Sequence, residues 1–142
     1  MVMAAPFKTS RLVEFADTDM AGIMHFSAFF RYMEAAEHEL LRNLGFSVYS
    51  EIDGDVVSFP RVAASCEFHS PARCEDVLEI DVTVRRVGTK SVTYGFAFSQ
   101  HGRDVAMGEM TSVCCRVPHG EAPISIAIPA VVAERLRQLA AN

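Results

Sequence analysis

The pattern of apolar residues changes once along this 142-residue chain, and the change restricts the fold more than any other feature. From Phe26 to Phe46, apolar residues recur at intervals of three and four, which is typical of one side of an α-helix. Ser27 is a candidate N-cap, and Gly45 suits the position that ends a helix. From residue 62 onward, apolar and polar residues alternate, as in half-buried β-strands. The sequence therefore predicts one long helix beside a sheet.

The connections between the predicted strands are short. The loops span residues 71–76, 88–90 and 100–104, whereas a parallel crossover needs about a dozen residues or more. The sheet is therefore predicted to be mainly antiparallel, with one buried and one polar face. The alternating sets are Val62, Ala64, Cys66 and Phe68; Leu78, Ile80, Val82 and Val84; Val92, Tyr94, Phe96 and Phe98; and Val105, Met107, Glu109, Thr111, Val113, Cys115 and Val117.

A further strand is predicted from Lys8 to Phe15, and a C-terminal helix from Pro129 to Leu139, because proline suits the first turn of a helix. The predicted fold class is α+β: a curved antiparallel five-stranded sheet wrapped around one long central helix, plus a short C-terminal helix. We expect one domain over residues 1–142, since this length suits a single core. One helix leaves much of the sheet uncovered, so association of copies is expected.

Two carboxylates, Asp17 and Asp19, lie between the first predicted strand and the long helix, with Gly22 three residues later. The N-terminus of a helix offers unpaired backbone N–H groups and a partial positive charge. A carboxylate beside such donors suits attack on a carbonyl carbon. The carboxylate can act as base or nucleophile, and the N–H groups can hold the oxyanion.

Two simpler interpretations of this segment exist. Aspartates often cap helices or order turns, because their side chains bind nearby N–H groups. A calcium loop would need an oxygen ligand at its fifth position and a glutamate at its twelfth, and here those positions hold Ala21 and Ala28. We therefore exclude calcium and keep capping as an alternative.

Composition excludes several classes of protein. The net charge of −5 argues against a nucleic-acid-binding surface. No run approaches about 20 apolar residues, so no membrane span is predicted, and residues 1–6 lack the pattern of a signal peptide. A cytoplasmic protein is expected. The four cysteines form no C-x-x-C pair, so no metal site is predicted. The chain has no G-x-S-x-G motif of α/β-hydrolases.

Several segments together resemble one family. They are Glu14–Ile23, Arg31–Ala36, Cys66–Phe68 with Pro71, Glu75–Ile80, and Lys90–Ser91. On these residues, over nearly its whole length, the chain resembles the 4-hydroxybenzoyl-CoA thioesterase family of hot-dog fold proteins. The resemblance implies hydrolysis of an acyl-CoA to a free acid and CoA, at the interface of a homodimer or within a homotetramer. Coenzyme A belongs to the substrate, so no separate cofactor is implied.

The resemblance also implies roles for individual residues. Asp19 matches the catalytic carboxylate, as nucleophile or general base, and Asp17 matches a residue that orders the loop. The oxyanion donors would be backbone N–H groups near His25 and Phe26. Lys90 would meet the phosphates of CoA.

Gly22 and Ser91 complete the expected substrate-binding set. Some relatives carry basic residues next to the lysine, where this chain has Gly88 and Thr89, so Arg85, Arg86 and Arg103 are candidate replacements.

Some alternatives stay open. His25 either packs and hydrogen-bonds at the helix start, or orients water or contacts the substrate. Glu34 and Glu37 are expected on a solvated or interface face of the helix, with Glu34 alternatively bordering the acyl pocket. A hot-dog hydratase or dehydratase would pair Asp and His five residues apart, whereas Asp19 and His25 are six apart. A non-catalytic acyl-CoA-binding module is the third alternative, and the acyl group, aromatic or straight-chain, is left open.

Overall fold

The long helix lies where the apolar pattern predicted it. In the computed structural model, which describes residues 5–140, α1 spans Phe26–Asn43. Its N-cap is His25, whose Nδ1 accepts a hydrogen bond from the Ser27 N–H at 3.2 Å. The prediction of Ser27 as N-cap is therefore wrong, because the imidazole reaches the amide two residues ahead of it. Gly45 follows the helix with a φ of +89°, a left-handed conformation that favours glycine, as predicted.

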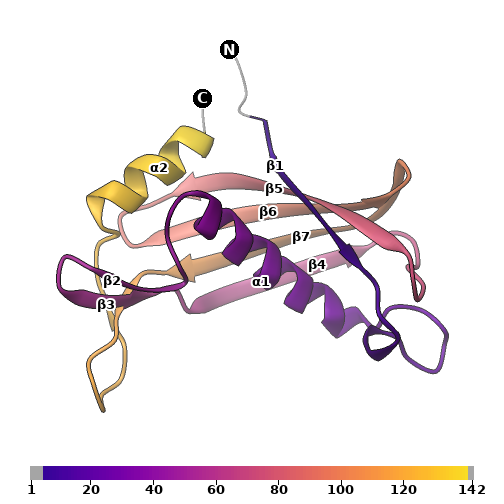
Figure 1. The fold of residues 1–142 in the computed structure, drawn as a ribbon, viewed down its shortest axis with the longest axis horizontal. Coiled ribbons are helices and arrows are strands. Elements are labelled where there is room, and N and C mark those ends of the chain that lie inside the picture. Colours follow the sequence, from indigo (N-terminus) through magenta and orange to yellow (C-terminus); the bar gives the residue numbers. More distant parts are fainter. Residues whose placement is uncertain (1–4, 141–142) are drawn as a thin grey trace.

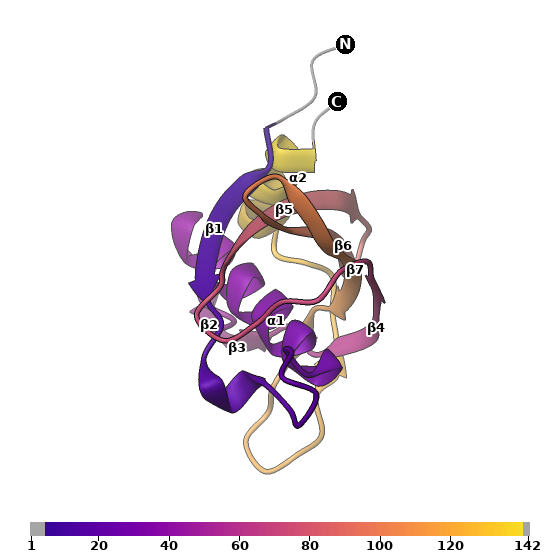
Figure 2. The same ribbon diagram turned by 90° about the vertical axis from the view of Figure 1, so that its right-hand side faces the viewer.

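The main sheet is antiparallel throughout and has five strands in the order β1-β5-β6-β7-β4. Their bounds are β1 Phe7–Leu12, β4 Arg61–Phe68, β5 Val77–Val87, β6 Ser91–Gln100 and β7 Arg103–Val113. Helix α1 lies along the sheet in Figure 1, and Figure 2, turned by 90°, shows it on the concave side of the strands. Antiparallel pairing between these strands is confirmed.

A second sheet was not predicted. It has four strands, in the order β2-β3-β8-β9: β2 Tyr49–Ile52, β3 Asp55–Ser58, β8 Cys115–Arg116 and β9 Ile124–Ser125. The strand predicted as continuous to Val117 is broken at Cys114, whose N–H donates to the carbonyl oxygen of Lys90 at 2.7 Å. Beyond that break, the chain leaves β7 and joins the second sheet.

The predicted inward residues of β5 and β6 are confirmed, since all eight are buried. In β7 the predicted phase is wrong after Val105: Ala106, Met110 and Ser112 are buried, while Met107 is 44% exposed. The β6–β7 pairing shifts register between Phe98 and Ser99, which moves the alternation by one residue.

Gly108 lies on the buried face of β7, at a position that has no room for a side chain. A Cβ atom at this position would lie 2.3 Å from the Sδ of Met33 in α1. The helix therefore approaches the sheet too closely here for any side chain. The sequence carries no local signal of this contact, because its other half lies 75 residues away.

Strand β4 departs further from the prediction. It is the last strand of the sheet order, and Val62 and Phe68 of its expected inward set are 62% and 48% exposed. The β4 main chain pairs with β7 on one side only. An edge strand with exposed apolar side chains is a place where another chain can pair.

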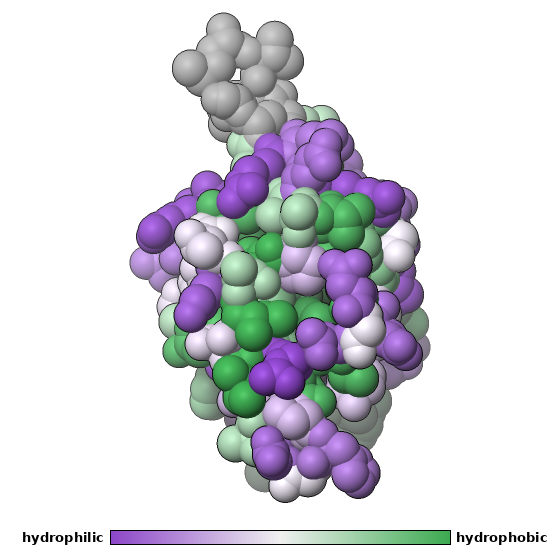
Figure 3. All heavy atoms as spheres, turned by 90° about the vertical axis from the view of Figure 1, so that its left-hand side faces the viewer, coloured by the Kyte–Doolittle hydropathy of each residue, from purple (hydrophilic) through white to green (hydrophobic). Residues whose placement is uncertain are grey.

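Helix α2 spans Ala130–Ala140 and packs against β5, which confirms the predicted C-terminal helix. Among residues 5–140, no helix is both long and apolar enough to cross a membrane. The space-filling view of the left-hand side of Figure 1, where α2 lies, shows hydrophobic atoms between polar ones (Figure 3). Val131 of α2 and Ile124 of β9 are partly exposed apolar residues in these elements.

Candidate active site

Asp19 lies in a tight loop between β1 and α1. The 3-10 helix η1, Phe15–Asp17, precedes it, and the loop is closed by a hydrogen bond from the Asp19 N–H to the Ile23 carbonyl at 3.0 Å. Gly22 has a φ of +78° and donates its N–H to the Asp19 carbonyl at 2.9 Å. The Asp19 carboxylate is exposed, and its Oδ1 accepts the Ala21 N–H at 2.8 Å. Within residues 5–140, Oδ2 takes part in no hydrogen bond, so it can meet a ligand.

The start of α1 has one unpaired amide. The His25 N–H donates to the Asp17 carbonyl at 2.8 Å, and the Ala28 N–H donates to the His25 carbonyl at 3.0 Å. The Ser27 N–H is capped by the His25 side chain. In the described part of the chain, nothing accepts a hydrogen bond from the Phe26 N–H. Of the two predicted oxyanion donors, the His25 amide is therefore occupied, and the Phe26 amide is available.

A cleft of about 540 Å³ opens beside the loop. Its lining is mostly apolar, with three polar residues, and consists of Asp19, Ile23, Met24, Phe26, Phe29, Phe68, His69, Ser70, Pro71 and Ala72. Phe29 and Phe68 meet edge to face, with ring centroids 5.2 Å apart. An apolar cleft with a few convergent polar groups is the usual form of a small-molecule site.

His25 is a capping residue in this structure. Its Nδ1 lies 2.8 Å from the Ser27 Oγ, and its ring lies 4.6 Å from that of Phe26. It does not belong to the lining of the cleft. Of the two interpretations of His25, the geometry matches packing and hydrogen bonding at the helix start.

Asp17 holds the loop in place through hydrogen bonds to its carboxylate. Its Oδ2 accepts hydrogen bonds from the Tyr32 hydroxyl at 2.5 Å and the Glu14 N–H at 3.1 Å, and its Oδ1 accepts one from Arg31 at 2.9 Å. Burial by itself raises the pKa of the Asp17 carboxyl, but the bonds from Tyr32, Glu14 and Arg31 outweigh it and leave that pKa below its ordinary value. Asp17 is thus a charged structural residue beside Asp19.

Replacing Asp17 with asparagine is expected to lower the free energy of unfolding by about 1–3 kcal/mol, the range for losing hydrogen bonds to a charged group. Because the pKa of Asp17 is lowered by folding, its contribution is fully present above the unfolded pKa of about 3.9 and is lost as the pH falls through the folded value. Urea unfolding between pH 3 and 7 should show a difference between wild type and Asp17→Asn that narrows toward pH 3. Asp55→Asn, on the exposed start of β3, is the control, and an equal loss in both variants would contradict this role.

Two polar residues of the cleft, His69 and Ser70, were not selected from the sequence, although Cys66–Phe68 and Pro71 on either side of them carried part of the resemblance. His69 follows β4, and its Nδ1 lies 2.7 Å from the Oδ2 of Asp104 in β7. The Ser70 Oγ donates to the Asp104 carbonyl at 2.5 Å and accepts from Arg103 at 2.6 Å. The Ser70 hydroxyl proton is therefore engaged, which disfavours Ser70 as a nucleophile. His69 and Asp104 are 35 residues apart, so only strand pairing brings them together.

Comparison with known proteins identifies the family. The profile described as thioesterase-like superfamily matches residues 13–136, which is most of the chain. The chain belongs to the thioesterase-like superfamily. The resemblance to a thioesterase family inferred from the motifs is therefore confirmed.

Individual members of the superfamily cover nearly all of the chain. A 1,4-dihydroxy-2-naphthoyl-CoA hydrolase from Thermosynechococcus vestitus is 29% identical over 122 residues, which are 84% of each protein. A gentisyl-coenzyme A thioesterase of known structure is 30% identical with a TM-score of 0.79, covering 89% of this chain and 98% of that one. A hypothetical protein from Aquifex aeolicus is 30% identical with a TM-score of 0.82, covering 93% and 100%. These similarities confirm a hot-dog thioesterase fold with antiparallel sheets and two helices.

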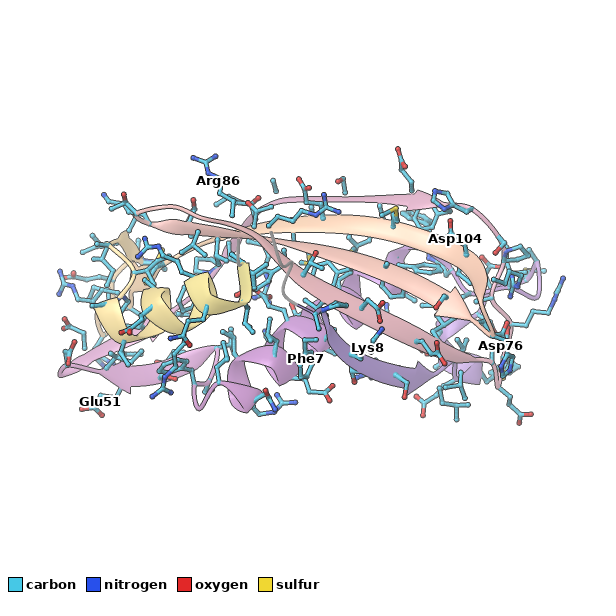
Figure 4. The ribbon with its side chains drawn as sticks, turned by 90° about the horizontal axis from the view of Figure 1, so that it is seen from above. Phe7, Lys8, Glu51, Asp76, Arg86 and Asp104 are labelled. Atoms are coloured by element: carbon cyan, nitrogen blue, oxygen red, sulfur yellow. The ribbon has the colours of Figure 1, made fainter. Side chains whose placement is uncertain are left out.

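Within one chain, Lys90 and Ser91 lie far from the other predicted site residues. The carbonyl oxygen of Asp76, the residue before β5, accepts a hydrogen bond from the Val13 N–H near the Asp19 loop, whereas Lys90 follows the far end of β5. An 11-residue strand spans roughly 36 Å at about 3.3 Å per residue. Figure 4 shows Asp76 and Asp104 at one end of the sheet and Arg86 toward the other.

Among the candidate replacements for basic neighbours of Lys90, only Arg103 lies beside the cleft within one chain. It donates to the Ser70 Oγ and, at 2.9 Å, to the Pro71 carbonyl, and both residues line the cleft. Arg73, which was not selected from the sequence, reaches the Gly22 carbonyl at 3.4 Å. No group of three or more potential metal ligands occurs among the residues that the structure describes.

The expectation of a solvated or interface position is wrong for Glu37. This residue of α1 is fully buried, forms an ion pair with Arg61 of β4, and accepts a hydrogen bond from the Ser112 Oγ at 3.0 Å. Burial raises the pKa of the Glu37 carboxyl, and Arg61 opposes that rise. Glu34, by contrast, is exposed.

Proposed function

We propose that this protein is an acyl-CoA thioesterase that hydrolyses an acyl-CoA to the free acid and CoA. The observation that carries the proposal is that Asp19 and Phe26 line the same cleft, and that an Asp19 oxygen and the Phe26 N–H both lack hydrogen-bond partners in the described chain. The carboxylate can attack a thioester carbonyl carbon or deprotonate a water that does so. The Phe26 amide, at the positive end of α1, can stabilise the oxyanion.

Both routes need only groups of this chain and water. In the first route Asp19 forms an anhydride with the acyl group, the C–S bond breaks, and water then hydrolyses the anhydride. In the second route Asp19 takes a proton from the attacking water. A thiolate leaves readily, so neither route requires a cofactor beyond the CoA of the substrate.

We propose an aromatic acyl group as the substrate. The named relatives act on 1,4-dihydroxy-2-naphthoyl-CoA and gentisyl-CoA. The edge-to-face pair of Phe29 and Phe68, together with Phe26, offers a planar ring the offset contacts that aromatic groups prefer.

We propose that the active unit is a homodimer paired through the free edge of β4. Strands related by a two-fold axis pair antiparallel, so the start of β4 in one copy would lie beside the end of β4 in the other. The Asp19 loop lies near the end of β4, at Phe68, and Lys90 lies at the opposite end of the sheet. Such a dimer would bring Lys90 and Ser91 of the second copy toward the Asp19 cleft of the first. There Lys90 would meet the CoA phosphates, with Gly22 of the first copy nearby.

Replacing Lys90 with alanine is expected to raise KM for acyl-CoA, with kcat nearly unchanged. Contacts to the phosphates are made equally in the ground and transition states, so they contribute uniform binding. Steady-state kinetics with CoA thioesters and with thioesters lacking the nucleotide would measure this. A fall in kcat alone, or an equal effect on the truncated substrate, would argue against phosphate binding.

Mixing two impaired variants tests the dimer directly, at an acyl-CoA concentration far below the raised KM of Lys90→Ala, where each variant alone turns over slowly. A heterodimer of Asp19→Asn and Lys90→Ala chains would contain one site with both native residues, provided that Lys90 acts across the interface. Activity should then recover on subunit exchange. If Lys90 served its own chain, no complete site would form and mixing would restore nothing.

The general function is tested by a panel of aromatic and straight-chain acyl-CoAs, with release of free thiol followed by a thiol-reactive dye. Only a thioesterase liberates CoA. A hydratase or dehydratase would change the acyl chain without releasing thiol, and a binding module would retain the intact thioester. Absence of thiol release from every acyl-CoA of the panel would overturn the proposal.

A further inference from the structure

The cleft beside Asp19 contains a histidine that the proposed chemistry does not yet use. His69 lines the cleft, and its Nδ1 is held by the Asp104 carboxylate at 2.7 Å. Its Nε2 has a single neighbouring carboxylate in the described residues, Glu67 at 3.8 Å, which is beyond hydrogen-bond distance. The outer nitrogen of the ring is therefore open to a ligand or to water.

Several bonds fix where this imidazole lies. The His69 N–H donates to the Val105 carbonyl at 2.8 Å, and the Ser70 N–H donates to the same carbonyl at 3.2 Å. The Ser70 hydroxyl and Arg103 then connect the segment to β7 on the other side of Asp104. Both partners of the His69–Asp104 pair are thus held at the same end of the β4–β7 strand pair, which gives the ring a defined direction.

The Asp104 contact also selects the tautomer of a neutral His69. Because a carboxylate only accepts hydrogen bonds, Nδ1 must carry the proton, which leaves the lone pair on Nε2. Nε2 is then an acceptor. His25 cannot take this role, since its Nδ1 caps α1 and its side chain lies outside the cleft lining.

We infer that His69, oriented by Asp104, positions the water molecule that completes thioester hydrolysis. This rests on the proposed thioesterase function. Nε2 accepts a hydrogen bond from one O–H of the water, which holds the oxygen lone pair toward the acyl carbon. In the general-base route the other O–H faces Asp19. In the anhydride route the same water attacks the acyl-aspartate. His69 acts through water in both routes, so it is a positioning residue.

The test compares variants that keep and remove the acceptor. A glutamine at 69 can donate its amide to Asp104 and present its oxygen in place of Nε2, whereas leucine cannot. His69→Leu is expected to lower kcat by about 10- to 30-fold, comparable to losing one to two hydrogen bonds in the transition state, with KM within about twofold. His69→Gln should retain kcat within about threefold.

Asp104 gives a parallel pair of variants. Asp104→Leu should lower kcat in the same way, while Asp104→Asn, whose amide oxygen can still accept the Nδ1 proton, should keep most of it. Glu67→Gln is the matched control and should leave both constants unchanged, because the Glu67 contact is too long to orient the ring. Thermal melting of all variants should agree within a few degrees.

A reaction with hydroxylamine in place of water distinguishes positioning of the water from other roles of His69. Hydroxylamine is a stronger nucleophile than water, so in His69→Leu the transfer of the acyl group to hydroxylamine should fall less than hydrolysis does. Equal losses in both reactions, a rise in KM at constant kcat, or a His69→Gln variant as slow as His69→Leu would each overturn the inference. Wild-type turnover is measured first. If wild type released no CoA from any thioester, the thioesterase proposal itself would fail, and the inference with it.

Discussion

Asp19→Asn is expected to reduce thioester hydrolysis by about 100-fold or more while the protein stays folded, a loss comparable to removing a key polar catalytic group. An asparagine oxygen can still accept the Ala21 N–H, so the loop should keep its shape. What disappears is the negative charge on Oδ2, which no described residue neutralises. Neither nucleophilic attack nor proton abstraction is then possible for this side chain.

The measurement for Asp19→Asn is dye-detected thiol release together with a thermal melt. Asp81→Asn is the matched control. This carboxylate pairs with Lys8 at 3.0 Å on the β1–β5 pair, outside the cleft, and its loss should leave turnover unchanged. Turnover near that of wild type in Asp19→Asn would refute the catalytic assignment.

Arg61→Met is expected to be strongly destabilising, lowering the free energy of unfolding by about 3–5 kcal/mol. It would leave the fully buried Glu37 carboxylate without its cationic partner. Arg61 also donates to the His38 Nε2 at 2.8 Å. Burial, and then Arg61, lower the pKa of His38; burial still lowers this pKa when Arg61 is replaced, which disfavours a charged imidazole as a substitute for the lost cation.

The loss in Arg61→Met should depend on pH. A buried carboxyl whose pKa is raised by folding favours the folded state at low pH, and that stability is lost as the pH rises through the folded pKa. Urea unfolding should therefore show a smaller defect toward acid pH than at neutral pH.

Two controls accompany this prediction. Arg86→Met removes an exposed arginine with no hydrogen bond or ion pair in the described chain and should change stability by less than about 0.5 kcal/mol. The double variant Glu37→Leu/Arg61→Met replaces both charges by apolar groups and should recover most of the loss. An unchanged unfolding midpoint in Arg61→Met would show that the ion pair does not stabilise the protein.

The elements predicted correctly are those whose signal is local. Helix α1 and the inward faces of β5 and β6 follow from periodicity within short stretches, because the burial of each residue depends on its own strand or helix geometry. The position of the loop with Asp17 and Asp19 before α1 is equally local. The Asp19 carboxylate and the start of the helix are neighbours in sequence as well as in space.

The errors arose where a distant residue controls the local pattern. Position 108 has room for no side chain because Met33 of α1 occupies the space where a Cβ atom would lie, and the phase of β7 shifts with its pairing to β6. Glu37 resembles any polar helix residue until Arg61 of β4 is brought against it. The edge position of β4 similarly leaves Val62 exposed although its own strand pattern predicts burial.

The features of the candidate site also differ in whether they depend on local or on long-range contacts. The amino-acid order alone indicated the protein's family, through several short motifs. It also indicated the long helix and the carboxylate before its start, because these two depend on contacts between near neighbours. The antiparallel order of strands placed His69 against Asp104 and put Lys90 at the opposite end of the sheet from Asp19. Those relations depend on strand length and pairing across tens of residues, which no short stretch of sequence encodes.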